Sequence, residues 1–163
     1  MREVERVITE YLAARNRFLS VAEQHPELLG GNDNIIGRIG EYLAISFLTK
    51  KDRKPKKVKS KSEKGHDLLV GTTKVSVKLL TSENMKGRGL RLTEPWDELL
   101  VIQLNTQSLE YRVGHLLKAQ FNKALTENRG WSQHPIVKRT MLGTNGLIGK
   151  YGSVENGKLD PAV

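Results

Sequence analysis

The chain of 163 residues contains no cysteine, which excludes disulfide bonds and thiolate metal sites. It has no apolar run approaching the roughly 20 residues that a membrane-spanning helix needs. The first residues, Met1 to Arg6, are mostly charged and are not followed by the apolar core of a signal peptide. From these absences we expect a soluble cytoplasmic (intracellular) protein with no membrane partner. Its length fits a single domain over residues 1–163.

Positive charge is abundant and unevenly distributed. Lysine and arginine number 27 against 18 aspartates and glutamates, a net charge of +9. Between Lys50 and Lys64 there are nine basic residues and two acids. Such a block repels itself and predicts a solvated loop, and its natural partner is a polyanion, most commonly nucleic acid. A basic loop that only keeps the protein soluble is the alternative.

Two helices are expected in the first third of the chain. Apolar residues recur at spacings of three and four over residues 3–24, which predicts an amphipathic helix. A second helix is expected over residues 34–49. Gly37 and Gly40 lie inside it, and we expect a closely packed backbone to offset their cost of roughly 1 kcal/mol each. Glu41 lies beside these small residues, either in a cleft or as an ordinary exposed glutamate.

Residues 65–80 predict a β-hairpin, with runs of valine and leucine on either side of a turn at residues 71–74. With the turn centred on Thr72 and Thr73, Asp67 lies directly opposite Lys78 on one face of the hairpin. A carboxylate and an ammonium placed together in this way form either a structural ion pair or half of a metal-dependent phosphodiesterase site.

The second half of the chain predicts more strands and one helix. Residues 90–92 fit a short strand, residues 98–104 a strand buried on both faces, and residues 109–113 its hairpin partner. A helix is expected over residues 115–128, a strand or short helix over 136–142, and an irregular segment over 129–163 as a whole. The order predicts an α+β fold, α/β/α sandwich-like, with a small mixed sheet flanked by helices.

Three short motifs together resemble the PD-(D/E)xK nuclease superfamily, whose fold is restriction-endonuclease-like. They are Gly37 to Ala44 around Glu41, then Gly65-His66-Asp67, then Val75-Ser76-Val77-Lys78. The resemblance covers residues 34 to 113, within a nuclease-like core of about 34–128. It implies a Mg²⁺-dependent DNA endonuclease, with Mn²⁺ as a substitute metal, that acts on double-stranded DNA and is compatible with a homodimer.

The resemblance also implies roles for individual residues. Asp67 and Glu41 would bind the cation through carboxylate oxygens, and the backbone carbonyl of Val77 would add a ligand. Lys78 would position or help deprotonate the attacking water.

One residue departs from the family's pattern. Ser76 occupies a position that is usually acidic, and a neutral hydroxyl is a poor Mg²⁺ ligand. Glu83 and Glu94 are the candidates to replace the missing acid. His66 is a further auxiliary candidate, although a surface or hydrogen-bonding histidine is the commoner role for such a residue.

Contacts with DNA are expected from the basic residues on either side of the hairpin: Lys54, Lys56, Lys57, Lys59, Lys61, Lys64, Lys86, Arg88 and Arg91. Trp96 and Trp131 would either stack on bases or pack in the core. Two other functions stay open. One is a non-catalytic nucleic-acid-binding protein that retains the nuclease fold, and the other is a basic RNA-associated structural protein.

Overall fold

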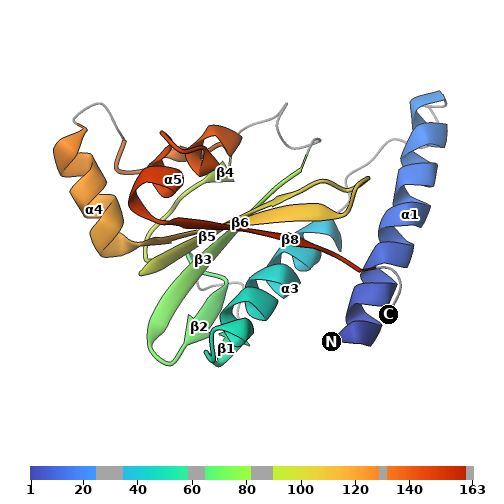
Figure 1. Cartoon of the computed structure of the whole chain (residues 1–163), viewed down its shortest axis with the longest axis horizontal. Helices are drawn as coiled ribbons and strands as arrows, with labels where there is room; N and C mark the ends of the chain where they lie inside the picture. Colours follow the sequence, from blue (N-terminus) through green and yellow to red (C-terminus); the bar gives the residue numbers. More distant parts are fainter. Residues whose placement is uncertain (25–34, 59–64, 82–89, 129–131, 161–163) are drawn as a thin grey trace.

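The computed structural model describes residues 1–24, 35–58, 65–81, 90–128 and 132–160 (Figure 1). The elements follow in the order α1 (Arg2–Gln24), α3 (Ile35–Lys50), β1 (Pro55–Lys57), β2 (Leu68–Val70), β3 (Thr73–Leu80), β4 (Leu90–Arg91), β5 (Glu98–Leu104), β6 (Glu110–Leu117), α4 (Lys118–Glu127), β7 (Ile136–Val137), the 3-10 helix η2 (Arg139–Leu142), α5 (Leu147–Tyr151) and β8 (Ser153–Lys158). The predicted α+β class is confirmed.

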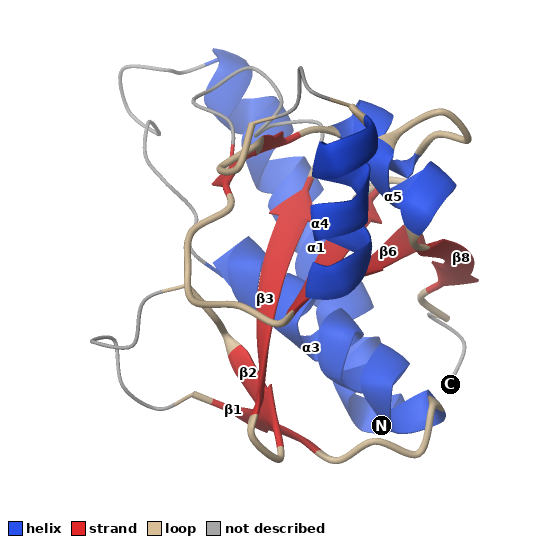
Figure 2. Ribbon diagram, turned by 90° about the vertical axis from the view of Figure 1, so that its left-hand side faces the viewer, coloured by secondary structure: helices blue, strands red, loops and turns tan. Residues whose placement is uncertain are grey.

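The main sheet has six strands in the order β1-β2-β3-β5-β6-β8. Strands β3 and β5 run parallel, and the other neighbours run antiparallel. Strands β4 and β7 form a separate two-stranded sheet. Figure 2 shows β1, β2 and β3 side by side at one edge of the main sheet. The small mixed sheet flanked by helices is therefore as predicted.

The two faces of the sheet bury different cores. Strand side chains alternate between faces, so Val75 and Leu79 of β3 join the core that includes α1 and α3, whereas Leu80 joins the core that includes α4 and α5. Residues of β5 contribute to both cores, which explains its nearly continuous apolar sequence. The ring of Trp96 is buried against Phe121, with centroids 5.4 Å apart, so this tryptophan packs in the core.

Close packing explains only one of the two glycines in α3. A Cβ atom on Gly40 would lie 2.9 Å from the Cβ of Leu79, so α3 approaches β3 at this point too closely for any side chain. A Cβ atom on Gly37 would meet nothing within 4 Å. The expectation that a neighbouring backbone requires Gly37 is therefore wrong.

The hairpin forms, but its turn is centred one residue earlier than predicted, so the partner of each residue shifts by two residues. Val70 pairs with Thr73 and Leu68 with Val75, so the turn consists of Gly71 and Thr72. Gly71 has a φ of 62°, a conformation that glycine adopts without strain and that two-residue hairpin turns require. Asp67 precedes β2 and donates its backbone N–H to the carbonyl of Val75 at 2.9 Å, so it is not opposite Lys78. The predicted direct pairing of Asp67 with Lys78 is wrong.

The C-terminal third is more regular than expected. Residues 115–117 continue β6, so the predicted helix begins only at Lys118. Residues 136–142 contain both a short strand, β7, and the 3-10 helix η2. Beyond them, α5 and β8 form, and β8 pairs with β6 along its whole length. The prediction of an irregular segment failed because the sequence SVENGK of β8 is polar and lies at the sheet's edge.

Helix α1 contacts the rest of the molecule along a narrow stripe. Ile8 and Leu12 are its buried apolar residues in the core. The side-chain amide of Asn16 donates to the carbonyl of Thr106 at 2.9 Å. In the part of the chain that the structure describes, neither α1 nor any other helix has the length and apolarity of a membrane span.

Candidate active site

Asp67 is held in place by backbone hydrogen bonds on both sides. Its N–H donates to the carbonyl of Val75 at 2.9 Å, and its own carbonyl accepts from the N–H of Val58 at 3.1 Å. Asp67 therefore bridges the ends of β1 and β2 to the middle of β3. These two hydrogen bonds fix the backbone of Asp67, and so they restrict the positions that its carboxylate can occupy.

Where β2 ends, the side-chain carboxylate of Asp67 accepts a hydrogen bond from the backbone of β3. The ladder between β2 and β3 ends at the pair Leu68–Val75, and Oδ2 of Asp67 accepts the next hydrogen bond, from the N–H of Val77 at 2.7 Å. In an antiparallel strand the N–H and C=O of one residue point to the same edge. The carbonyl oxygen of Val77 is therefore directed to the same side of β3 as the carboxylate.

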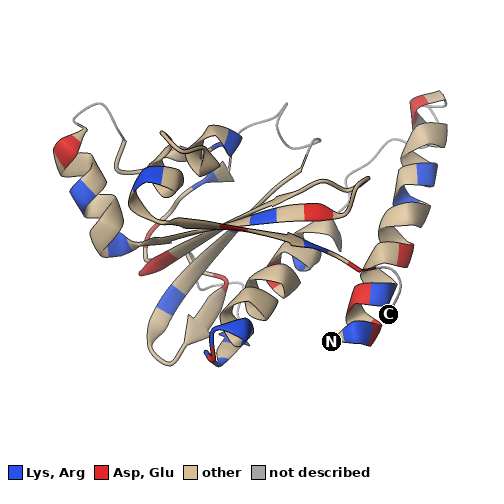
Figure 3. Ribbon diagram, in the orientation of Figure 1, with Lys and Arg blue, Asp and Glu red and all other residues tan. Residues whose placement is uncertain are grey.

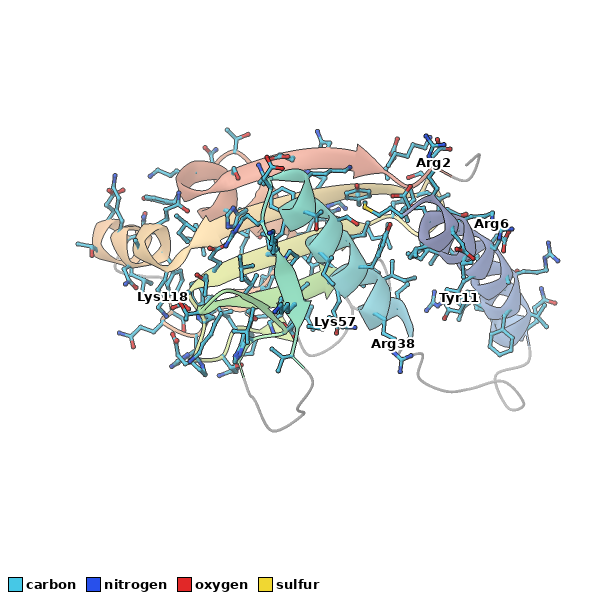
Figure 4. All side chains as sticks on the ribbon, turned by 90° about the horizontal axis from the view of Figure 1, so that it is seen from below. Arg2, Arg6, Tyr11, Arg38, Lys57 and Lys118 are labelled. Carbon is cyan, nitrogen blue, oxygen red and sulfur yellow. The ribbon has the colours of Figure 1, made fainter. Side chains whose placement is uncertain are left out.

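Glu41 reaches this region from α3. Its carboxylate forms an ion pair with Lys57 of β1, and Lys57 lies opposite Leu68, the residue after Asp67. The side chain of Glu41 is 30% exposed, so it is neither buried nor fully in solvent. Figure 4 shows Lys57 beside α3 and Arg38 at the start of that helix. Glu41 therefore faces β1, the strand that pairs with β2 of the hairpin, and its carboxylate is partly exposed.

Lys78 lies on the other face of the sheet. It shares that face with Ser76, and it is half-buried beside Val101 of β5. Asp67 lies just before β2, beyond the last β2–β3 pair, so the ladder pairs it neither directly nor diagonally with Lys78. Among the described residues Lys78 forms no ion pair with either carboxylate. Glu41 and Lys78 thus approach the Asp67 edge from opposite faces.

Ser76 is fully buried, and its hydroxyl has no hydrogen-bond partner among the residues that the structure describes. A side chain with no exposed surface is not available to solvent or to a substrate. The position that is acidic in the resembling family therefore contributes neither charge nor an accessible oxygen here.

The three auxiliary candidates His66, Glu94 and Glu83 differ in their surroundings. His66 is buried, so it is not a surface histidine. Glu94 has its backbone against Gly65, since a Cβ on that glycine would lie 2.5 Å from the Glu94 carbonyl. Its carboxylate, however, is paired with Lys118. Glu83 lies outside the described residues.

The oxygen donors at this edge suit a hard cation, although few of them come from side chains. Within the described ranges, no three histidine, aspartate or glutamate side chains form a group that could hold a metal. This edge offers the carboxylate of Asp67 and the carbonyl of Val77, while the carboxylate of Glu41 is paired with Lys57 on β1. Mg²⁺ prefers oxygen ligands and keeps several waters, so this donor set fits it with water completing the shell.

Positive charge surrounds the same edge. Lys54, Lys56 and Lys57 are exposed on and just before β1, the outermost strand beside the hairpin. Figure 3 shows basic residues gathered at the β1 end of the structure. Arg91 is also exposed. Lysines on an edge strand also prevent edge-to-edge aggregation, which is the alternative role for these residues. The other predicted contacts lie outside the described residues: Lys59, Lys61, Lys64, Lys86 and Arg88, as does Trp131.

A buried charge network that the sequence did not reveal fixes the segment leading into β1. Arg53 donates two hydrogen bonds to the carboxylate of Glu98, at 2.6 and 2.8 Å, and Nε2 of His115 lies 2.9 Å from the same carboxylate. Burial alone would raise the pKa of Glu98, but the hydrogen bonds and charges of His115 and Arg53 outweigh it and lower that pKa to about 2. The network anchors Arg53 and so helps to place Lys57 beside Glu41.

No signal in the sequence identifies this network, because its members lie far apart in the chain and on different elements. The apolar pattern of the sequence predicts a helix at His115 and the start of an apolar strand at Glu98. Comparison of this chain with protein-family models, with curated proteins and with solved structures gives no match.

Proposed function

We propose that this protein is a Mg²⁺-dependent DNA endonuclease that resembles the PD-(D/E)xK superfamily and hydrolyses phosphodiester bonds. The observation that carries this proposal is the 2.7 Å hydrogen bond between the Asp67 carboxylate and the Val77 N–H. It lies where β2 ends, on the side of β3 to which the Val77 carbonyl is also directed. Glu41, the third expected ligand, is directed to the neighbouring strand through Lys57.

In this proposal Asp67, Glu41 and the Val77 carbonyl hold the metal. When bound, Mg²⁺ polarises a phosphate oxygen and lowers the pKa of a coordinated water. The ion pair with Lys57 neutralises Glu41 in the free protein, so Glu41 has to leave that lysine before it can act as a ligand. Lys57 is then free to contact a phosphate.

The basic residues have two separate tasks in this proposal. Lys78 faces the edge from the far side of the sheet, where its ammonium can orient the attacking water and offset the charge that develops on the phosphate. Lys54, Lys56 and Lys57 position the DNA backbone without reading its sequence, because phosphate contacts carry no base information.

A non-catalytic nucleic-acid-binding protein with the same fold is the second candidate. The observation that favours it is Ser76, which is fully buried and supplies no acid where the family has one. Among the described residues, the carboxylates of Asp67 and Glu41 are then the remaining acidic ligands of this proposal. In this alternative the basic β1 region binds DNA or RNA, and Asp67 has the structural role of completing the β3 edge.

Incubation of the purified protein with supercoiled plasmid, in Mg²⁺ or in EDTA and at low and moderate salt, tests the proposal. We expect nicked or linear DNA with Mg²⁺ and intact plasmid with EDTA. Binding to labelled duplex DNA and duplex RNA is measured in parallel. Salt-dependent binding with intact plasmid under every metal condition would favour the non-catalytic alternative instead.

A further inference from the structure

Helix α1 carries a second apolar stripe, most of which the other described residues leave exposed. Val4, Val7, Phe18 and Val21 are 44%, 52%, 51% and 45% exposed. They belong to one helix of 23 residues, about 35 Å long at 1.5 Å per residue. Scattered apolar residues are normal on a surface, but a continuous row of them on one helix indicates an interface.

The stripe has the spacing of a coiled-coil seam. Its members alternate three and four residues apart over three heptads: Val4, Val7, Tyr11, Ala14, Phe18 and Val21. This is the a/d pattern by which two helices interlock side chains. The stripe borders the one that contacts the core: Ile8 and Leu12 are buried there, and Tyr11 is half-buried against the same core. Figure 4 shows α1 at the margin of the molecule, with only part of its circumference facing the sheet.

The seam is complementary to itself when a second helix runs antiparallel. In that arrangement an a position meets a d position, so Val4 meets Val21 of the second copy, Val7 meets Phe18, and Tyr11 meets Ala14. Each layer then combines residues from opposite halves of the helix. A two-fold axis near the middle of α1 generates all of these layers at once, as expected for an isologous dimer.

The charges beside the seam favour the same arrangement. On its solvent side the g positions are Glu3, Glu10, Arg17 and Gln24, so the first half of this row is acidic and the second half contains its one cation. Antiparallel pairing places Glu10 against Arg17 of the second copy, and symmetry repeats the contact. Glu10 touches Arg6 of its own helix at 3.4 Å, but both side chains are more than half exposed. The Glu10 carboxylate is therefore accessible to a second cation.

We infer that a second copy of this chain covers the seam, with α1 packed antiparallel on α1 across a two-fold axis. This inference does not depend on the proposed nuclease activity. The dimer buries the apolar row and joins each Glu10 to an Arg17, whereas a parallel pairing would leave both charges without these partners.

Sedimentation equilibrium of the full chain tests the assembly. We expect a mass of twice 18.3 kDa for the wild type. Val7→Glu and Phe18→Glu each put a charge into a core layer, and we expect each to weaken dimerisation by about a hundredfold or more. Both residues are exposed in the single chain, so circular dichroism should show unchanged folding. Ala13→Glu, on the exposed polar side of α1, is the matched control and should remain dimeric.

A charge exchange and a disulfide test the orientation. Glu10→Arg should weaken the dimer, and adding Arg17→Glu should restore it. Because the chain has no cysteine, Val4→Cys protomers mixed with Val21→Cys protomers should cross-link on oxidation, whereas neither variant alone should. Cross-linking of Val4→Cys alone would contradict antiparallel packing. A wild-type mass of 18.3 kDa at every concentration, or dimers that survive Val7→Glu and Phe18→Glu, would overturn the inference.

Discussion

The carboxylate of Asp67 and the backbone N–H of Val77 are joined by a hydrogen bond of 2.7 Å. The Asp67 side chain therefore accepts a hydrogen bond from a backbone N–H of β3 that lies beyond the last β2–β3 pair. It also directs a negative charge to the edge where the Val77 carbonyl lies. The bond itself needs only an acceptor, whereas cation binding needs the charge. These two roles can be separated by substitution.

Lys57→Gln should increase the apparent affinity for Mg²⁺. The substitution removes the cation that pairs with Glu41, and a partly exposed pair is worth about 0.5 to 1 kcal/mol. We therefore expect the Mg²⁺ concentration for half-maximal plasmid cleavage to fall about two- to fivefold. Lys51→Gln, which breaks the exposed 2.7 Å pair with Glu155, is the control and should leave that concentration unchanged. Equal behaviour of the two variants would show that Lys57 does not compete for Glu41.

The sequence predicted the elements that carry strong periodicity. α1, α3 and β5 lie close to where the apolar patterns placed them. Register was not predictable to one residue, because Gly71-Thr72 and Thr72-Thr73 are both plausible turn centres by composition. The structure selects the first because Gly71 adopts a positive φ. β8 was missed because a polar edge strand is specified by its partner β6 and not by its own pattern.

Ser76→Ala should leave stability nearly unchanged. The buried hydroxyl has no hydrogen-bond partner among the described residues, so its removal leaves no new unsatisfied group. We expect the free energy of unfolding in urea to change by less than about 0.5 kcal/mol, and metal-dependent cleavage to persist. A loss of cleavage with intact stability would assign the hydroxyl a direct role at the site.

Glu98→Gln should destabilise the protein by about 3 kcal/mol at neutral pH, since it breaks a buried pair with Arg53 and His115. The folded-state pKa of Glu98, about 2, is below its ordinary value of 4.5. The stability that this carboxylate contributes is therefore fully present above pH 4.5 and is lost as the pH falls toward 2. Urea unfolding followed across this range should show a smaller acid loss for the variant than for the wild type.

Glu155→Gln is the control for this experiment. It removes an exposed carboxylate paired with Lys51 at 2.7 Å, and we expect a change of no more than about 0.5 kcal/mol with an unaltered acid profile. Identical acid profiles for the wild type and Glu98→Gln would mean that Glu98 does not set the acid stability.

The two glycines of α3 should respond to alanine in opposite directions. Gly40→Ala would bring a methyl group to 2.9 Å from the Cβ of Leu79, and overpacking of this kind costs about 1 to 3 kcal/mol. Gly37→Ala meets open space and should stabilise the helix by up to about 1 kcal/mol. Thermal unfolding by circular dichroism measures both, and an equal effect of the two substitutions would contradict the close approach of α3 to β3.

The candidate site was predictable in its parts but not in its arrangement. The sequence singled out Glu41, Asp67 and Lys78 by residue type and order. It could not show that Glu41 pairs with Lys57, or that Lys78 lies on the opposite face from α3, because both follow from tertiary packing. The sequence also could not show the Arg53–Glu98–His115 network, because tertiary packing brings these three residues together.

The cleavage of supercoiled plasmid by Asp67→Asn in Mg²⁺ tests the central claim most directly. Asparagine retains an oxygen that can accept the Val77 N–H but has no charge, so we expect a folded protein that binds DNA and does not cut it. Asp97→Asn is the matched control, because Asp97 accepts the Lys74 N–H of the same strand at 2.8 Å. It should cleave like the wild type. Cleavage by Asp67→Asn at the wild-type rate would contradict the account.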